Sequence, residues 1–561
     1  MEPAGAFTFV LHSHLPYARL AGRWPHGEEW IHEAATETYI PLLNALNDLH
    51  DEGVAVRLTL GLTPILVEQL DDEDVRDHLD QYLDDKIEAA QKDIERFDEA
   101  EDAQLAVLAR FYLELFEDIK QSFDVRYNRD LIGACRKLQD EGVIEITTSA
   151  ATHGYLPLLG TDSAIYGQLK TGIDAYKGHF GRAPRGIWLP ECAYRPAYLT
   201  DEGTRPGIEQ FLEELGIKVF FVETHTIEGG QPVGVAAGDA IGPYGEVKRR
   251  YVIPMQEAIP ERSATTFNPY FVSDTTSGPE AESHSGVAVI GRDNRTGMQV
   301  WSAEWGYPGD YDYREFHKKD SVSGLQYWRV TGPRVDLAHK DYYHPDWAAG
   351  KIREHARHFA WLAADRLRQH YDETGEFGLI ASNYDTELFG HWWFEGVEWL
   401  KQVLRLLAED PSVELTTAST YVETHKPQSV LHIPESSWGA GGNHWTWDNH
   451  DTHWMWGPIH KAEQTMQALA DRFTDPSEDE EAVLNQAARE LLLLEASDWP
   501  FLVTTGQARE YAIRRFTRHV ERFEALAASL ESGTPDRQLA DELYEVDKVF
   551  PDIDYRWFRA R

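Results

Sequence analysis

The chain has 561 residues and a formal net charge of −42 at pH 7, with 42% hydrophobic and 12% aromatic residues. This composition excludes a disordered chain, and the negative charge makes nucleic acid and anionic membranes unfavourable partners because phosphate would be repelled. No apolar run reaches membrane-spanning length and no signal-type segment is present, so we expect a cytoplasmic protein. Two cysteines, Cys135 and Cys192, provide neither a disulfide framework nor a zinc cluster.

The excess of acidic residues predicts a solvated acidic surface that is suited to high salt, since Asp and Glu number 95 and Lys and Arg only 53. Self-repulsion should weaken as the Debye length falls from about 10 Å at 0.1 M to about 3 Å at 1 M salt. We therefore expect the thermal unfolding midpoint to rise across this range, as measured by circular dichroism. A midpoint that is indifferent to salt would dismiss the hypothesis.

Short apolar runs alternate with helical stretches and predict a parallel β-sheet with helical crossovers. Seven or eight such strands indicate a closed barrel of the TIM type, whose sites lie at the carboxyl ends of the strands. The predicted strands are Ala6–Leu11, Val54–Leu62, Val143–Thr148, Gly186–Leu189, Lys218–Val222, Val287–Ile290, Phe377–Ala381 and Val413–Thr417.

Three segments depart from this alternation. Residues 66–130 are acidic with apolar residues at helical spacing, and predict a helical insertion after the second strand. Residues 229–286 are rich in Gly, Pro, Ser and Thr, which favours a long functional loop. After Pro427 a Gly- and Trp-rich segment is followed by amphipathic helices over Glu480–Ala496 and Thr505–Ser529, so we expect a catalytic barrel over residues 1–427 and an α-helical domain over residues 428–561.

Polar residues directly follow many of the predicted strands. Because the carboxyl ends of parallel strands meet at one end of a barrel, these residues should form one active site. They are His12 and His14 after the first strand, His153 after the third, Glu191 after the fourth, Arg292 and Asp293 after the sixth, and Asp385 after the seventh.

Two of these residues are carboxylic acids at strand ends among aromatic residues. Glu191 follows Trp188-Leu189-Pro190, and Asp385 follows Tyr384. Glycosidic bond chemistry needs such a pair, one carboxylate to attack the sugar and one acid to protonate the leaving oxygen.

The pair His12 and His14 leaves a second class of function open. An H-x-H sequence at a strand end can bind a metal ion, with His153 and Asp385 completing the ligands of a metal-dependent hydrolase such as a polysaccharide deacetylase. The sequence lacks a further closely spaced pair of ligands, so the metal hypothesis ranks second and we expect no metal or cofactor. A glucan-binding scaffold that uses neither acid is a third alternative.

Tryptophans in glycine-rich or loop segments predict stacking on sugar rings, with packing between domains as the alternative. They are Trp24, Trp30, Trp301, Trp438, Trp445 and Trp447. His391 and Trp392, which follow Asp385, are expected to support the site, and Trp393 to pack in the core.

These motifs, in this order, resemble glycoside hydrolase family 57, and most closely its α-1,4-glucan branching enzymes. The resemblance runs nearly from end to end of the chain. It rests on His12-Ser13-His14-Leu15-Pro16-Tyr17, Thr152-His153-Gly154-Tyr155, Trp188-Leu189-Pro190-Glu191-Cys192-Ala193-Tyr194, Gly291-Arg292-Asp293, Tyr384-Asp385-Thr386-Glu387-Leu388-Phe389-Gly390-His391-Trp392-Trp393 and the segment from Trp438 to Trp447.

The resemblance implies a (β/α)7 barrel, so that either Lys218–Val222 or Val413–Thr417 would be additional. It implies a retaining mechanism without metal, with Glu191 as nucleophile, Asp385 as acid/base and the carboxyl groups about 5–5.5 Å apart. The implied substrate is an α-glucan, and the rival activities in the family are those of an α-amylase and a 4-α-glucanotransferase. A monomer is plausible.

The resemblance also implies which residues bind the glucan. His12, His14 and His153 would line the donor subsite, and Trp24, Trp30, Trp301, Trp438 and Trp447 would stack on the chain, with Arg292, His391 and Trp392 as further binding residues. A tyrosine in the loop region 229–286 would close the site against water, and Tyr244 is the first candidate, with Tyr251 and Tyr270 as competitors.

Overall fold

A computed structural model describes residues 2–201, 203–232, 258–276, 283–302 and 306–561. Within this part of the chain, seven parallel strands follow one another around a TIM-like barrel. They are β1 (Gly5–Ser13), β2 (Leu58–Leu62), β3 (Ile144–Thr147), β4 (Gly186–Ile187), β7 (Val219–Val222), β9 (His284–Gly291) and β10 (Gly378–Asp385).

The strand pairs form two sheets that meet through single contacts. A bridge between Thr148 and Ile187 joins β3 to β4, and the backbone N–H of Asp293 donates to the carbonyl of Ala381 where β9 meets β10. All nine residues of β1 are buried, as expected for a strand covered on both faces.

All eight predicted strands are present, and their pairing identifies the additional one. β7 lies between β4 and β9 and is part of the barrel, so the suspicion that fell on Lys218–Val222 was wrong. β11 (Val413–Leu415) pairs only with Gly5–Phe7 at the start of β1, beside the position that β2 takes farther along. The predicted strand Val54–Leu62 is shorter than expected and begins at Leu58.

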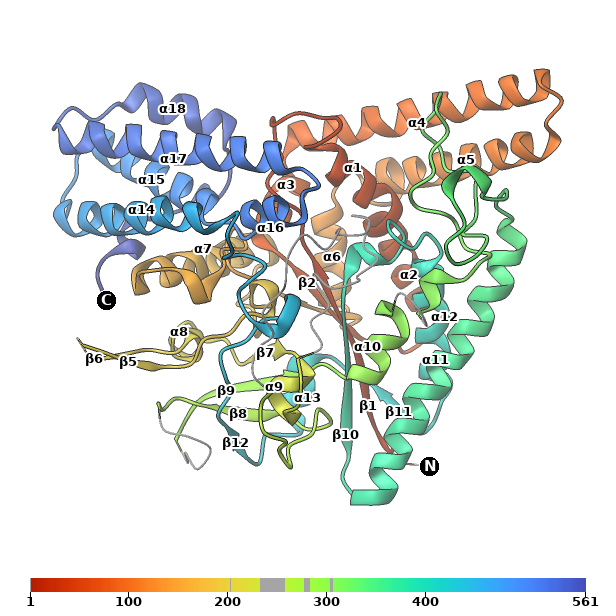
Figure 1. Cartoon of the computed structure of the whole chain (residues 1–561), viewed down its shortest axis with the longest axis horizontal. Helices are drawn as coiled ribbons and strands as arrows, with labels where there is room; N and C mark the ends of the chain where they lie inside the picture. Colours follow the sequence, from red (N-terminus) through yellow and green to blue (C-terminus); the bar gives the residue numbers. More distant parts are fainter. Residues whose placement is uncertain (1, 202, 233–257, 277–282, 303–305) are drawn as a thin grey trace.

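Helices connect these strands over the outside of the barrel (Figure 1). They are α1 (Glu29–Ala34) and α2 (Ile40–Asp51) after β1, α3 (Pro64–Asp71) to α6 (Leu131–Asp140) after β2, α7 (Asp162–Phe180) after β3, α8 (Ile208–Glu214) after β4, α9 (Thr224–Glu228) after β7, α10 (Asn294–Trp301) and α11 (Pro345–Thr374) after β9, and α12 (Gly396–Glu409) after β10; α13 (Ala418–Thr424) follows β11.

The expected helical insertion contains a long antiparallel pair, α4 (Glu73–Glu99) and α5 (Ala103–Gln121), which projects at the upper right of Figure 1. Asp72 begins α4 as its N-cap, because its side chain accepts a hydrogen bond from the N–H of Val75. The expected loop region 229–286 is partly regular, since β8 (Tyr270–Ser273) pairs antiparallel with β9.

Beyond the barrel the chain forms a group of helices, at the upper left of Figure 1. They are α14 (His453–Arg472), α15 (Glu478–Leu494), α16 (Asp498–Thr505), α17 (Arg509–Glu531) and α18 (Arg537–Val546). The predicted helix Thr505–Ser529 begins later than expected, because Gly506 at φ +78° ends α16. Val430–Leu431 (β12) still pairs with β8 of the barrel, beyond the expected boundary at residue 427.

The barrel and the C-terminal helices share one hydrophobic core. Trp188 and Val219 of the barrel belong to the same buried cluster as Leu491 and Phe516 of the C-terminal helices. Of the helices that the structure describes, none has the length and apolar character needed to cross a membrane.

Candidate active site

Glu191 lies in a short 3-10 turn, Pro190–Cys192, directly beyond β4. Its φ of +62° is uncommon for a residue with a side chain, and such strained backbone clusters at functional sites. The indole N–H of Trp438 donates to one carboxylate oxygen at 2.6 Å, and the hydroxyl of Ser497 donates to the other at 3.3 Å. Both oxygens are therefore held by groups from beyond the barrel strands.

Asp385 is the last residue of β10 and lies beside His12 in the strand register. Burial, followed by the negative charges of Glu387 and Glu191, raises the pKa of Asp385 well above its ordinary value. The ring of His12 connects the two acids, because its Nε2 lies 3.1 Å from His153, whose Nδ1 lies 3.8 Å from a carboxylate oxygen of Glu191. The two carboxyl groups therefore belong to one site. Burial also raises the pKa of Glu191, to about 7, against the hydrogen bond from Trp438 and the charge of His14.

The surroundings of the two acids favour different forms, although burial raises the pKa of both. The donors around Glu191 favour its ionised form, while no hydrogen-bond donor to Asp385 is recorded among the described residues. Two acids whose environments push them apart in this way suit a nucleophile and a proton donor.

Three histidine rings form a stack behind Glu191. The ring of His12 stacks on Trp188 at 4.7 Å, and its Nε2 lies 3.1 Å from Nε2 of His153. The ring of His14 stacks on His153 at 3.8 Å. Burial lowers the pKa of His12 and of His153 well below the ordinary value, so both are neutral at pH 7.

His14 differs from the other two rings because it has an acidic partner. Its Nε2 lies 2.9 Å from a carboxylate oxygen of Asp498, at the start of α16. Burial would lower the pKa of His14, but the charge and hydrogen bond of Asp498 raise it overall. His14 is less deeply buried than His12 and His153. Direct contact of these three histidines with a substrate stays a prediction.

The histidines do not form a metal site in this geometry. Within the described residues, the only group of at least three His, Cys, Asp or Glu with ligand atoms within 4.8 Å of one another is Glu490, His519 and Asp547. Neither His12 nor His14 belongs to it, and the guanidinium of Arg522 already pairs with Asp547. The geometry therefore offers no ligand set for the metal-dependent alternative.

A pocket of about 320 Å³ opens beside Glu387, between the barrel and the C-terminal helices. It brings together the predicted residues Trp30, His391 and Trp392. Its other lining residues are Leu15, Pro16, Pro25, His26, Glu33, Phe316, Glu387, Leu502, Gln507 and Ala508. Trp24 is 79% exposed and belongs to the loop that precedes Trp30, but it does not line the pocket.

The pocket wall at His391 is held by a half-buried charge network. Nδ1 of His391 lies 2.7 Å from one carboxylate oxygen of Glu37. The other carboxylate oxygen of Glu37 accepts from the guanidinium of Arg314 at 3.0 Å. Burial would raise the pKa of Glu37, but the charge of Arg314 and the hydrogen bond of His391 lower it to about 2. Glu37 therefore stays ionised and fixes the ring of His391.

Several predicted binding residues have other roles in the structure. Trp447 is fully buried and stacks on Tyr155 at 4.3 Å, so the prediction that it stacks on a glucan is wrong. Trp438 is also buried, and its role is the hydrogen bond to Glu191 rather than an open stacking face. Trp393 is buried as expected, and Trp301 is half-buried beside Tyr384 at 6.4 Å.

Arg292 and the loop residue Tyr270 are engaged with other groups of the protein. Arg292 is buried and pairs with Glu223 at 3.2 Å. Its charge offsets part of the rise that burial causes in the pKa of Asp385. Direct contact of Arg292 with a substrate stays a prediction. Tyr244 and Tyr251 lie outside the described residues. The hydroxyl of Tyr270 donates to the carbonyl of Thr265, so this tyrosine is engaged within its own turn.

Three further polar residues of the site were not predicted from the sequence: Glu387, Ser497 and Asp498. Glu387 accepts from the backbone N–H of His14 at 3.2 Å and from the hydroxyl of Tyr39, and burial raises its pKa to about 7. Its position two residues after Asp385, on the same turn, was a usable signal. Ser497 and Asp498 had a weaker signal, a polar pair directly before a helix.

Replacement of Trp438 by Phe should raise the pKa of Glu191 further, because it removes the N–H that stabilises the carboxylate. We expect kcat/KM to fall about tenfold at pH 7 and its acid limb to move to higher pH. The measurement is a pH profile of kcat/KM on amylose. Trp393→Phe is the matched control, since its buried N–H has no hydrogen-bond partner in the described structure; an unmoved acid limb in Trp438→Phe would contradict the assignment.

Comparison with known proteins places this site in a family. Residues 8–434 match the family described as Glycosyl hydrolase family 57, and residues 458–558 match the family described as 1,4-alpha-glucan branching enzyme, C-terminal. The chain is 45% identical over 558 residues to a 1,4-alpha-glucan branching enzyme of Thermococcus kodakarensis, covering 97% of this chain and 77% of that protein.

Solved structures give the same result for the fold. The crystal structure of a branching enzyme from Thermococcus kodakaraensis has a TM-score of 0.88 at 43% identity, covering 100% of this chain and 97% of that chain. An α-amylase from Thermotoga maritima, AmyC, has a TM-score of 0.81 at 32% identity, covering 99% of each chain. The chain therefore belongs to glycosyl hydrolase family 57.

Proposed function

We propose that the protein is a 1,4-α-glucan branching enzyme, which cleaves an α-1,4 bond of a glucan and re-forms it as an α-1,6 branch. The observation that carries the proposal is the half-buried pair Glu191 and Asp385, embedded in a chain that is similar over nearly its whole length to a named branching enzyme. The second family match, over residues 458–558, supports branching over the other α-glucan activities.

In the proposed mechanism, Glu191 attacks the anomeric carbon while Asp385 donates its proton to the leaving glycosidic oxygen. The anomeric carbon–oxygen bond breaks, and a covalent glucosyl-enzyme forms through the carboxylate of Glu191. Asp385, now ionised, then takes the proton from the 6-hydroxyl of an acceptor chain. That oxygen displaces Glu191, which gives the α-1,6 linkage with retained configuration.

The pocket beside Glu387 supports transfer to a sugar rather than to water. Its walls come from the loop after β1, from the segment after β10 and from the C-terminal helices, so two parts of the chain surround an acceptor. Aromatic side chains such as Trp30 and Trp392 offer apolar faces to sugar rings, and a bound acceptor displaces competing water. We propose residues 1–427 as the catalytic part and residues 428–561 as the part that completes this groove.

We also propose Tyr244 as the closing residue of the loop region 229–286, and the cytoplasm as the location of the enzyme. Hydrolysis is the second candidate activity, because the similar Thermotoga maritima protein AmyC is an α-amylase.

The test is a proton NMR time course on amylose with the purified protein. Growth of the α-1,6 signal with few new reducing ends would support branching. New reducing ends without an α-1,6 signal would replace the proposal by hydrolysis. No change in either signal would reject both activities.

A further inference from the structure

The loop between β1 and α1 is a compact unit that reaches the pocket. The backbone N–H of Glu28 donates to the carbonyl of Gly22 at 3.0 Å, and the side chain of Glu28 accepts from the N–H of Leu20 at 2.8 Å. Gly27 has φ +131°, and a Cβ on it would lie 2.1 Å from the carbonyl oxygen of Gly22. The loop can therefore close only without a side chain at that position.

This loop supplies one rim of the pocket. Pro25, His26 and Trp30 line the pocket, while Trp24 projects into solvent next to them. The position of the rim therefore depends on whatever holds the loop in place.

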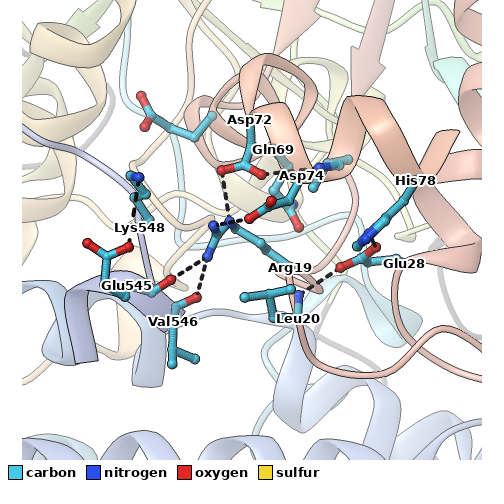
Figure 2. Close-up of polar contacts among 12 residues, drawn as sticks. Arg19, Leu20, Glu28, Gln69, Asp72, Asp74, His78, Glu545, Val546 and Lys548 are labelled. Carbon is cyan, nitrogen blue, oxygen red and sulfur yellow. Dashed lines mark hydrogen bonds and ion pairs between the residues drawn. The ribbon is translucent and has the colours of Figure 1, made fainter. Parts of the chain in front are cut away.

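The anchor of the loop is Arg19, which is 4% exposed (Figure 2). Its Nε donates to Asp72 at 2.8 Å and its Nη2 donates to Asp74 at 2.6 Å, so one side of the guanidinium meets the start of α4. Its Nη1 donates to the carbonyls of Glu545 and Val546, at 2.8 and 2.9 Å, at the end of α18.

The partners of Arg19 lie at the ends of two helices. Asp72 is the N-cap of α4, and the two carbonyls belong to the last turn of α18, where the helix dipole favours a cation. The planar guanidinium donates in several fixed directions at once, which the ammonium of lysine cannot reproduce. Burial would lower the pKa of Arg19, but Asp72 raises it overall, so the group is charged.

A second contact holds the far end of the same loop. The carboxylate of Glu28 lies 2.6 Å from Nδ1 of His78 on α4. Figure 2 shows both anchors, the guanidinium of Arg19 against Asp72 and Asp74, and the carboxylate of Glu28 against His78. Arg19 and Glu28 thus tie the loop to α4 near both of its ends, and Arg19 also ties it to the end of α18, where the hydroxyl of Tyr17 donates to the carbonyl of Val546 as well.

We propose that Arg19 is a positioning residue for the acceptor: it fixes the rim formed by Pro25, His26 and Trp30 against the C-terminal helices, and so sets how well an acceptor glucan competes with water. This inference rests on the proposed branching function. Arg19 does not line the pocket itself, so it acts through the loop.

The test compares Arg19→Met and Arg19→Lys with wild type on amylose. Initial rates of α-1,6 linkage formation are measured by NMR, and new reducing ends are measured chemically. We expect Arg19→Met to lower the ratio of α-1,6 linkages to reducing ends about fivefold and to raise KM, with the rate of bond cleavage changed less than about twofold. Arg19→Lys should recover part of the ratio, because it keeps the charge.

Arg205→Met is the matched control. Arg205 likewise bonds one carboxylate, Asp162 at 2.7 Å, and one backbone carbonyl, that of Leu159 at 3.0 Å, but it does not touch the loop. Arg205→Met should leave the ratio of α-1,6 linkages to reducing ends unchanged. If Arg19→Met does not fold, Asp74→Asn removes a single anchor at an exposed position and should shift the ratio in the same direction by less.

The outcomes separate this inference from the proposed function. A folded Arg19→Met or Asp74→Asn protein with the wild-type ratio and KM would overturn the role of Arg19. An equal shift in Arg205→Met would also overturn it, because the effect would then be one of general stability. A wild-type protein that forms no α-1,6 linkages would reject the proposed function, and an unchanged KM in Arg19→Met would then reject the inference separately.

Discussion

Glu191→Gln is expected to lower kcat for both transfer and hydrolysis on the order of 10⁴-fold or more, as is typical when a covalent nucleophile is removed. An amide cannot form the glucosyl-enzyme, although it keeps the shape that Trp438 and Ser497 hold. The measurement is the steady-state rate on amylose, with intact mass spectrometry to confirm that no covalent intermediate accumulates. Substantial residual turnover would reject Glu191 as nucleophile.

The same substitution should stabilise the folded protein at high pH. The pKa of Glu191 is about 7 in the folded protein and lies near its ordinary, lower value in the unfolded chain. A raised pKa in the folded state means that stability is lost as pH rises through about 7, and Gln removes this loss. We expect the free energy of unfolding of Glu191→Gln to exceed that of the wild type by on the order of 2 kcal/mol at pH 8, and the difference to vanish near pH 4.

Glu463→Gln is a matched control for the effect on activity. Glu463 is a buried carboxyl in α14, and its pKa is raised by burial to about 8, but it bonds the backbone of Thr161 away from the site. It should leave kcat near the wild-type value. A large loss of activity in this variant would show that charge removal in the interior, rather than loss of the nucleophile, explains the effect.

Asp385→Asn is expected to lower kcat on amylose on the order of 10³-fold, because an amide cannot protonate the leaving oxygen. Burial and the neighbouring acids hold the proton on Asp385 in the resting enzyme, and this proton is the one that is lost. An α-maltosyl fluoride substrate needs little protonation, so it should still form the glucosyl-enzyme. Added azide should then restore turnover by attacking that intermediate.

The configuration of the azide product distinguishes the roles of the two acids. Azide that attacks the intermediate of Asp385→Asn gives an α-glycosyl azide, whereas azide that replaces the missing nucleophile of Glu191→Ala gives a β-glycosyl azide. Proton NMR of the anomeric signal separates them. A β product from Asp385→Asn, or no product at all, would contradict the assignment.

The sequence predicted most of the barrel and both acids, because these are local properties. Alternating apolar runs specify buried strands wherever they fall in the chain, and all eight predicted strands are present. Glu191 and Asp385 were recognisable as candidates because each lies at or shortly beyond the end of its strand, at the end of the barrel where sites form. The helical insertion and the C-terminal helices were readable for the same reason, from apolar residues at helical spacing.

Only the tertiary structure decided which residues serve those acids. Ser497 bonds Glu191 across 306 positions of sequence and Asp498 bonds His14 across 484, and no local pattern records such a pairing. The glycine-rich flanks predicted that Trp438 and Trp447 would be open to a glucan. In the structure Trp447 is buried on Tyr155 of the barrel, and the N–H of Trp438 donates to Glu191.

Sequence alone therefore determined the barrel strands and placed Glu191 and Asp385 near strand ends, since apolar periodicity and the residues that end a strand are local properties of short stretches of chain. The pairing of strands decided that Val413–Leu415, and not Val219–Val222, is the additional one. The hold of Arg19 on α4 and α18 likewise exists only in three dimensions, because a buried guanidinium needs partners on every side and the chain brings them from positions 53 to 527 residues away.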